Sequence, residues 1–247
     1  MKLNEKKFFE LAAQNKFEAA DIFFHRNYAF SVSVFRGQVD SLTQNENCLV
    51  TARGLVDGKF GSVTTEAIDK DTCEFLVNGI KKTAKVIENA DPAIIFKGSE
   101  KYHKKSVFIK DALTNNVDEK IKLCLEIEKK LLAFDKRINE VVTVGYEESF
   151  SEDKLSNSYG LKLSQKQTEI SVFAEITAKV GDEVRTGFKV FADLDFSKFN
   201  VDEFVKDVAY DALSKLGSVQ CESKKYPVVL DPKAASTMIK FLLNSID

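Results

Sequence analysis

The chain has 247 residues, of which 44% are hydrophobic and 30% are charged, so it can bury a sizeable core. We expect two domains rather than one large one. The formal net charge of −2 provides no basic field for a phosphate backbone, so direct nucleic-acid binding is not expected. No apolar run approaches the roughly 18 residues that a membrane span needs, and residues 1–7 lack the apolar segment of a signal peptide. Neither a membrane span nor a secretory leader is therefore expected.

The cysteines indicate a reducing compartment. They are scattered and form no C-x-x-C pair, which is typical of reduced structural thiols. The four positions are Cys48, Cys73, Cys124 and Cys221. We therefore expect a cytoplasmic protein.

The first part of the chain has the pattern of a helix, a meander of strands and a second helix. Phe8, Leu11 and Ala12 suggest a short amphipathic helix, and tight turns are predicted at residues 36–37 and 57–58. The expected strands cover residues 21–27, 30–36, 48–56 and 59–63. Asp71 and Glu74 are predicted to cap the second helix, and its apolar stripe is Cys73, Leu76, Val77, Ile80, Ala84 and Ile87. The signals Asp91–Pro92 and Lys97–Gly98 then indicate a boundary.

The second part begins with a predicted helix near residues 117–134, with Ile121, Cys124, Leu125, Leu131 and Leu132 on one side. Residues 170–178 and 184–192 are predicted to form a long hairpin around Gly181–Asp182. A helix capped by Asn200 and Glu203 runs to Gly217. A last strand at residues 226–230 leads through Asp231 and Pro232 into a final apolar helix.

Runs of strands joined by short turns, with helices between the runs, favour an α+β fold with antiparallel sheets in two successive units. We predict domains at residues 1–98, 99–222 and 223–247.

No catalytic, cofactor-binding or metal-binding residue is predicted in this chain. His25 and His103 stand alone, whereas a zinc protease helix needs two histidines and a glutamate. The glycine-rich segment 54–61 precedes a strand, so a turn is favoured over a phosphate cradle. Close carboxylates at residues 147–148, 152–153 and 193–195 are interpreted as solvated loops. A Cys48–His25 thiolate pair stays a weaker alternative.

Several ordered segments resemble the TldD/PmbA family of metalloprotease-related proteins. "SVSVFRGQVDS" and "ARGLVDGKFGSVTT" resemble the turns of its first domain. The further segments are Leu155–Gly160, which resembles the end of a central strand, Ala212–Gly217, which resembles a helix end, and Tyr226–Pro232, which resembles the strand that opens the final domain. The resemblance covers nearly the whole chain, but family members are roughly twice as long. It therefore implies that the C-terminal domain is truncated here.

The resemblance also implies a function. Catalytic members carry an H-E-x-x-x-H helix after the strand that residues 226–230 resemble, whereas residues 236–243 hold no metal ligand. This departure resembles the PmbA/TldE-like branch, whose members associate with a zinc-bearing TldD-like subunit to form a peptidase. The chain is thus expected to need no cofactor of its own, to associate with such a subunit or with itself, and to help process unfolded, extended peptides.

The alternative is a non-enzymatic interaction module, such as a gyrase or toxin–antitoxin modulator. For the peptidase role, a strand edge should be accessible to peptide, with Ser33, Ser171 and Thr177 as candidate edge positions. The apolar face of the last helix, which includes Met238 and Leu242, is expected to drive self-association.

Overall fold

The computed structural model describes residues 3–88, 94–103, 105, 107–109 and 116–246. The chain divides into two compact units, Met1–Leu216 and Gly217–Asp247, and each is described by itself. The predicted boundary signal at Asp91–Pro92 lies outside the described residues.

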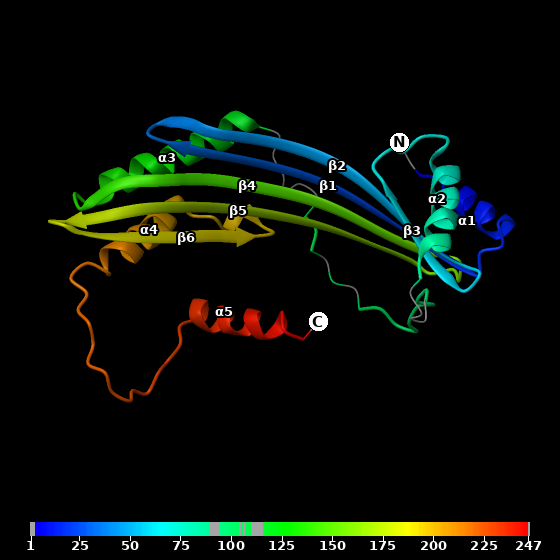
Figure 1. The fold of residues 1–247 in the computed structure, drawn as a ribbon. Helices are drawn as coiled ribbons and strands as arrows, with labels where there is room; N and C mark the ends of the chain where they lie inside the picture. Colours follow the sequence, from blue (N-terminus) through cyan, green and yellow to red (C-terminus); the bar gives the residue numbers. More distant parts are fainter. Residues whose placement is uncertain (1–2, 89–93, 104, 106, 110–115, 247) are drawn as a thin grey trace. The chain divides into compact units, whose positions relative to one another are not determined.

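The first unit is one antiparallel sheet with helices, which confirms the predicted α+β class (Figure 1). The strand order is β3-β2-β1-β4-β5-β6. The strands are β1 (Ala19–Phe35), β2 (Gln38–Val56), β3 (Lys59–Thr65), β4 (Ile138–Asn157), β5 (Lys162–Val180) and β6 (Glu183–Asp193). The helices are α1 (Glu5–Gln14), α2 (Thr72–Val86), α3 (Val117–Phe134), the short 3-10 turn η1 (Phe196–Lys198) and α4 (Val201–Leu213).

Strands from the two predicted units form a single sheet rather than two. β1 pairs with β4 from Asp21 opposite Asn157 to Val34 opposite Val144. The predicted domains 1–98 and 99–222 therefore share a continuous backbone ladder, and their boundaries stay predictions. β1 also runs unbroken through residues 28–29, where the sequence predicts a gap between two strands.

The carboxylate segments 147–148 and 152–153 belong to β4, so their interpretation as solvated loops is wrong. β4 lies between β1 and β5, and both neighbours supply hydrogen bonds to its backbone whatever its side chains are. The ladder therefore continues through a polar segment. Asp193, by contrast, ends β6, and Asp195 follows it as the cap of η1.

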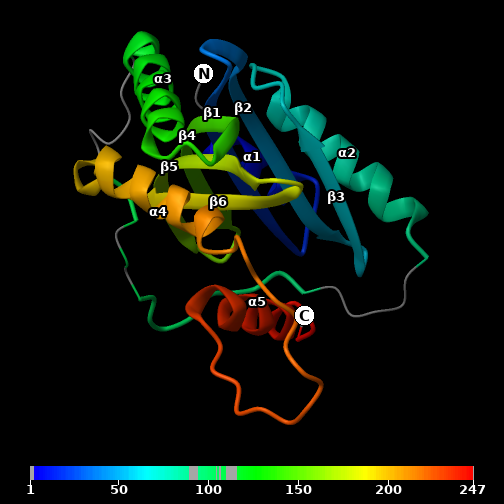
Figure 2. The same cartoon turned by 90° about the vertical axis from the view of Figure 1, so that its left-hand side faces the viewer.

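The helices cover both ends of one sheet face and leave its middle open. Alternate residues of β1 are buried on one face at both ends of the strand, namely Ala20 and Ile22 at one end and Phe30, Val32 and Val34 at the other. Ala20 and Ile22 belong to the cluster under α1 and α2, whereas Phe30, Val32 and Val34 belong to the cluster with α3 and α4. Figure 1 shows these two helix pairs at opposite ends of the long strands, and Figure 2 views the sheet from the end that carries α3 and α4.

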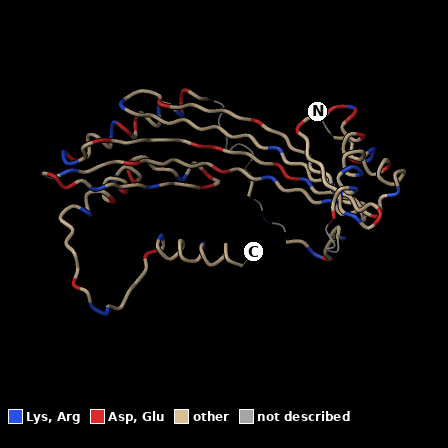
Figure 3. The backbone as a smooth tube through the Cα atoms, viewed as in Figure 1, with Lys and Arg blue, Asp and Glu red and all other residues tan. Residues whose placement is uncertain are grey.

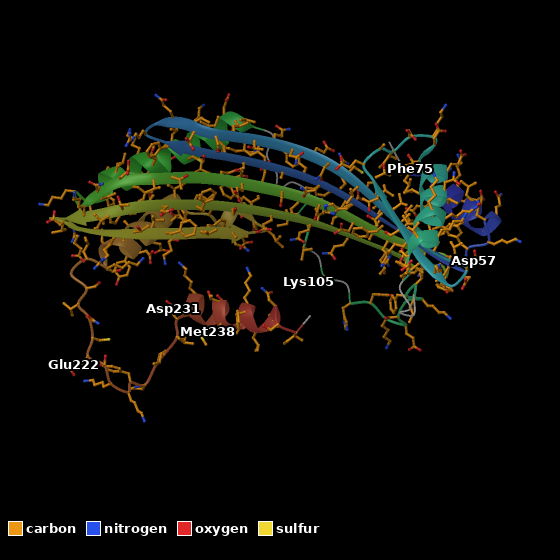
Figure 4. All side chains as sticks on the ribbon, viewed as in Figure 1. Asp57, Phe75, Lys105, Glu222, Asp231 and Met238 are labelled. Atoms are coloured by element: carbon orange, nitrogen blue, oxygen red, sulfur yellow. The ribbon has the colours of Figure 1, made fainter. Side chains whose placement is uncertain are left out.

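Local signals set most of the turns and caps as predicted. Arg36–Gly37 and Asp57–Gly58 all have positive φ, as the two-residue hairpin turns require, and Asp57 lies at the tip of the β2–β3 hairpin (Figure 4). The Asn200 side chain accepts from the N–H groups of Asp202 and Glu203, which confirms that cap. The predicted Asp71 cap is corrected, because Asp71 begins α2 without a side-chain hydrogen bond.

The second unit contains α5 (Pro232–Leu243), which Asp231 caps as predicted. The predicted strand at 226–230 is wrong, because no neighbouring strand pairs with it in the described part of the unit and its side chains are exposed. Every α5 side chain is at least partly exposed, including Met238 (Figure 4). Among the described helices, none is both long enough and apolar enough to cross a membrane.

Candidate functional site

The uncovered middle of the helix-bearing face contains a hollow of about 720 Å³. We call it the central hollow. Its walls come from the start of α1, from the middles of β1, β2 and β4, and from the segment after β3. Its lining residues are Leu3, Glu5, Phe24, Arg26, Glu46, Cys48, Glu66, Ile68, Glu152 and Lys154. Figure 3 shows charged residues of both signs along the strands between the two helical ends.

Ion pairs arrange part of this lining. Arg26 Nε donates to Glu46 Oε1 over 2.9 Å, and this interaction raises the pKa of Arg26. Glu152 lies 3.1 Å from Lys154 Nζ and 3.6 Å from Lys166 Nζ. Burial tends to raise the pKa of Glu152, but the hydrogen bonds and charges of these lysines hold it below its usual value. Burial also raises the pKa of the Cys48 thiol, so the hollow does not favour a thiolate.

The edge of β2 beside the hollow has no strand partner over much of its length. β3 pairs only with Val50–Val56, so residues 38–49 have a neighbour, β1, on one side only within the described structure. Val56 and Lys59 flank a two-residue turn, so the N–H of each residue donates to the carbonyl of the other. The backbone groups of Val56 therefore point away from β1. Backbone groups point to alternate sides along a strand, so every second residue counted back from Val56 also points its N–H and C=O away from β1. In the unpaired part of β2 these residues are Leu42, Gln44, Glu46 and Cys48. We call this segment the free β2 edge.

Side chains partly close the opposite edge of the sheet, which is formed by β6. In β6, the Phe188 N–H donates to Asp211 Oδ2 over 3.0 Å, and Lys215 Nζ donates to the Thr186 carbonyl over 2.8 Å. Both partners come from α4 and its C-terminal turn. An accessible edge therefore lies on β2 at residues 38–49, and residues 162–166 of β5, which pair with β4 alone, form a second unpaired stretch within the described structure. Ser33 on β1, and Ser171 and Thr177 on β5, each have a paired strand on both sides, so the prediction of edge positions there is wrong.

The histidines of this chain do not form a metal site. His25 Nδ1 lies 2.6 Å from Asp153 Oδ1 on the neighbouring strand, so the prediction that His25 stands alone is corrected. His103 is exposed in the segment before α3. No group of three histidine, cysteine or carboxylate side chains suited to a metal occurs in the described ranges. The described residues therefore offer no ligand set that fits zinc.

Two other sequence candidates have structural explanations. Cys48 pairs with Arg26 across β1 and β2, so His25 points to the opposite face and the thiolate pair does not form. The glycine-rich segment 54–61 is a hairpin, as its turn pattern predicts. A Cβ at Gly61 would lie 2.2 Å from the Ile80 carbonyl oxygen, which shows that glycine lets α2 approach the sheet closely.

A buried polar cluster under α3 was missed at the sequence level. Lys120 Nζ lies 2.6 Å from Glu148 Oε1, and Tyr146 donates its hydroxyl to Glu148 Oε2 over 2.8 Å. The Lys120 ammonium also lies 4.1 Å from the centroid of the Phe30 ring. Burial, together with the Glu148 charge, raises the pKa of Tyr146. Lys120 and Glu148 are closed off from solvent, so this cluster fixes α3 on the sheet rather than binding a ligand.

Comparison with known proteins gives these features a family context. The model for the PmbA/TldA metallopeptidase central domain matches residues 110–216, and the model for domain 1 of the same proteins matches residues 20–90. Together they cover more than half of the chain. The chain belongs to the PmbA/TldD family. This family is metallopeptidase-related, and the two matched segments contain all six strands except the first residue of β1.

Relatives of this PmbA/TldD chain are about twice its length. It is 22% identical over 237 residues to Metalloprotease MJ0996 of Methanocaldococcus jannaschii, which covers 89% of this chain and 49% of that protein. A proposed modulator of DNA gyrase from Thermotoga maritima matches with a TM-score of 0.78 and 23% identity, over 89% of this chain and 49% of that one. TldE from Thermococcus kodakarensis matches with a TM-score of 0.76 and 18% identity, over 85% and 47%. These structural likenesses show a shared fold.

Proposed function

We propose that this chain is part of a PmbA/TldE-like subunit that holds extended peptide for a metal-bearing TldD-like partner. The free β2 edge carries this proposal. A row of outward N–H and C=O groups is what strand addition of an unfolded peptide requires. In a metallopeptidase-related family, such a surface fits the handling of extended peptide.

Zinc is assigned to the partner subunit in this proposal. Residues 236–243 of α5 offer serine, threonine, methionine, lysine and apolar side chains. Zinc in peptidases is instead held by imidazole and carboxylate ligands, which leave a position for the water that attacks the peptide bond. This chain therefore contributes binding rather than hydrolysis.

Reconstitution with a TldD-like subunit tests the proposal. The chain and the partner are expressed separately and together, and cleavage of an unfolded polypeptide is followed by mass spectrometry. We expect the two to co-elute, and we expect faster cleavage by the mixture than by the partner alone. A partner variant with a metal-ligand histidine replaced by alanine is the control for the source of cleavage.

Two results would contradict the proposal. One is zinc bound to this chain alone and lost in His25→Ala or His103→Ala. The other is a mixture in which the chain neither associates with the partner nor changes its cleavage. The second result would favour the non-enzymatic interaction module.

A further inference from the structure

We infer that the free β2 edge and the central hollow form one peptide-binding site that selects an extended segment with lysine or arginine at alternate positions. This inference rests on the proposed function for the class of ligand, and it adds where the segment binds and which side chains it carries. Its test uses this chain alone, so failure of reconstitution with a partner leaves it standing.

Geometry places an added strand in line with β3. β3 occupies the position beside β2 from Val50 to Val56 and leaves the sheet after Thr65. A peptide paired with residues 42–48 would occupy the same row of the sheet, at the usual spacing of roughly 4.8 Å from β2. The segment 66–68 bounds this row at the β3 end, and Glu66 and Ile68 line the hollow there. The site is therefore closed at one end and open at the other.

The pleat determines which peptide side chains meet the hollow. Glu46 and Cys48 line it and belong to the set of β2 residues whose backbone groups point outward. In an antiparallel addition, the peptide residues opposite them form hydrogen-bonded pairs and project from the same face. Every second peptide side chain thus lies over the hollow, and the amides of these same residues bond to β2.

Charge selects a basic side chain at these positions. Carboxylates outnumber cations in the lining: they are Glu5, Glu46, Glu66 and Glu152, against Arg26 and Lys154. Glu46 and Glu152 have cationic partners within the protein. Glu5 accepts a hydrogen bond from the Ser156 hydroxyl but forms no ion pair within the described structure, and neither does Glu66. Lysine or arginine over the hollow would supply the missing positive charge.

The closed β6 edge supports this assignment. Side chains of α4 and its C-terminal turn satisfy backbone groups there, which is a known protection against unwanted strand pairing. No described side chain or backbone group bonds to the outward groups of Leu42, Gln44 and Cys48. The chain therefore protects these groups of β6 and leaves the free β2 edge available.

The test uses short peptides with alternating lysine and threonine, about nine residues long, with a fluorescent label. Fluorescence anisotropy measures their binding to the chain. We expect the lysine peptide to bind and a matched glutamate–threonine peptide to bind at least about tenfold more weakly. N-methylation of the lysine amides should abolish binding, whereas N-methylation of the threonine amides should change affinity by less than about threefold, because only the former face β2.

Variants of the hollow provide the matched protein control. Glu46→Gln combined with Glu66→Gln should weaken binding of the lysine peptide by about tenfold at low salt, and less at high salt. Glu169→Gln alters an exposed carboxylate on the opposite face and should leave affinity unchanged.

Three outcomes would overturn the inference. Equal binding of both methylated peptides would show a purely electrostatic contact without strand addition. Equal binding of the lysine and glutamate peptides would remove the selection for basic segments. Concentration-dependent dimerisation of the chain that blocks the lysine peptide would assign the free β2 edge to a second copy.

Discussion

The two ends and the middle of the helix-bearing face share one backbone ladder but differ in their side chains. At the ends, alternate positions of β1 hold residues such as Ile22 and Val32, and helices bury them. In the middle, the equivalent positions Phe24 and Arg26 line the central hollow instead. Strand pairing thus builds the sheet throughout, whereas side-chain chemistry decides which part of it is covered and which part is left for a ligand.

The largest expected effect comes from the buried cluster at the α3 end. Lys120→Met leaves the Glu148 carboxylate buried without its ammonium partner, so we expect a loss of about 3–5 kcal/mol in the free energy of unfolding. Urea denaturation measures it. Adding Glu148→Gln removes the buried charge and keeps an acceptor for Tyr146, so most of the loss should be recovered. If Lys120→Met alone were as stable as the parent, the Lys120–Glu148 pair would not be buried in solution.

A smaller effect is expected at the closed β6 edge. Asp211→Ala removes the acceptor of the Phe188 N–H and the partner of Lys215, and it should cost about 0.5–1.5 kcal/mol. Concentration-dependent association should increase, because the edge becomes available. Gln44→Ala on the free β2 edge is the matched control and should change neither property.

The free energy of unfolding that Asp211→Ala loses should depend on pH. Burial opposes the charged form of Asp211, but Lys215 and the Phe188 N–H hold its folded pKa below the ordinary value of 3.8. Because the pKa of Asp211 is lower in the folded than in the unfolded state, its charged form stabilises the fold at pH values above the unfolded pKa of about 4. This stabilisation is lost as the pH falls through the folded pKa. Asp211→Ala should therefore be less acid-sensitive than the parent in this range. If Asp211→Ala lost stability at low pH as steeply as the parent, the result would contradict the ion pair between Asp211 and Lys215.

The middle of the face should tolerate substitution. Glu152→Gln removes a carboxylate whose two lysine partners are substantially exposed, so the free energy of unfolding should change by only about 0–1 kcal/mol. Thermal unfolding compares this variant with Lys120→Met. A loss as large as that of Lys120→Met would mean that the middle is packed as tightly as the ends.

The rate at which each cysteine reacts with a thiol reagent should follow its burial. The exposed Cys221 should react fastest with a thiol reagent, Cys48 more slowly, and Cys73 and Cys124 only after unfolding. Burial raises the pKa of Cys124 to about 12, which keeps it protonated in the folded protein. Variants that retain one cysteine each separate the four rates. Fast labelling of Cys124 would contradict its burial under α3.

Sequence patterns predicted the elements that have a strict apolar period. α3 was located at its observed bounds, and alternate residues from Ile170 to Ala178 are buried as expected. β4 was missed because its middle carries Glu147, Glu148, Glu152 and Asp153, which interrupt the apolar alternation, and pairing on both sides carries the strand through this polar segment.

The candidate site could not be predicted for a related reason. The central hollow joins residues from α1, β1, β2, β4 and the segment after β3, and no local spacing reveals this contact. Lys120 and Glu148 were likewise missed, because burial of a charged side chain depends on a partner 28 positions away. The strand edges illustrate the same limit: periodicity found the hairpins, but only the order of strands shows which edge is open.

Amide-resolved hydrogen exchange tests the central claim most directly. In the free chain, the amides of Leu42, Gln44, Glu46 and Cys48 should exchange fast, whereas those of Thr43, Asn45 and Asn47 should be protected by β1. Adding the lysine–threonine peptide should slow the first set and leave the second unchanged. Uniform protection of all seven amides in the free chain, or no change in the first set on adding peptide, would contradict a strand edge that receives extended peptide.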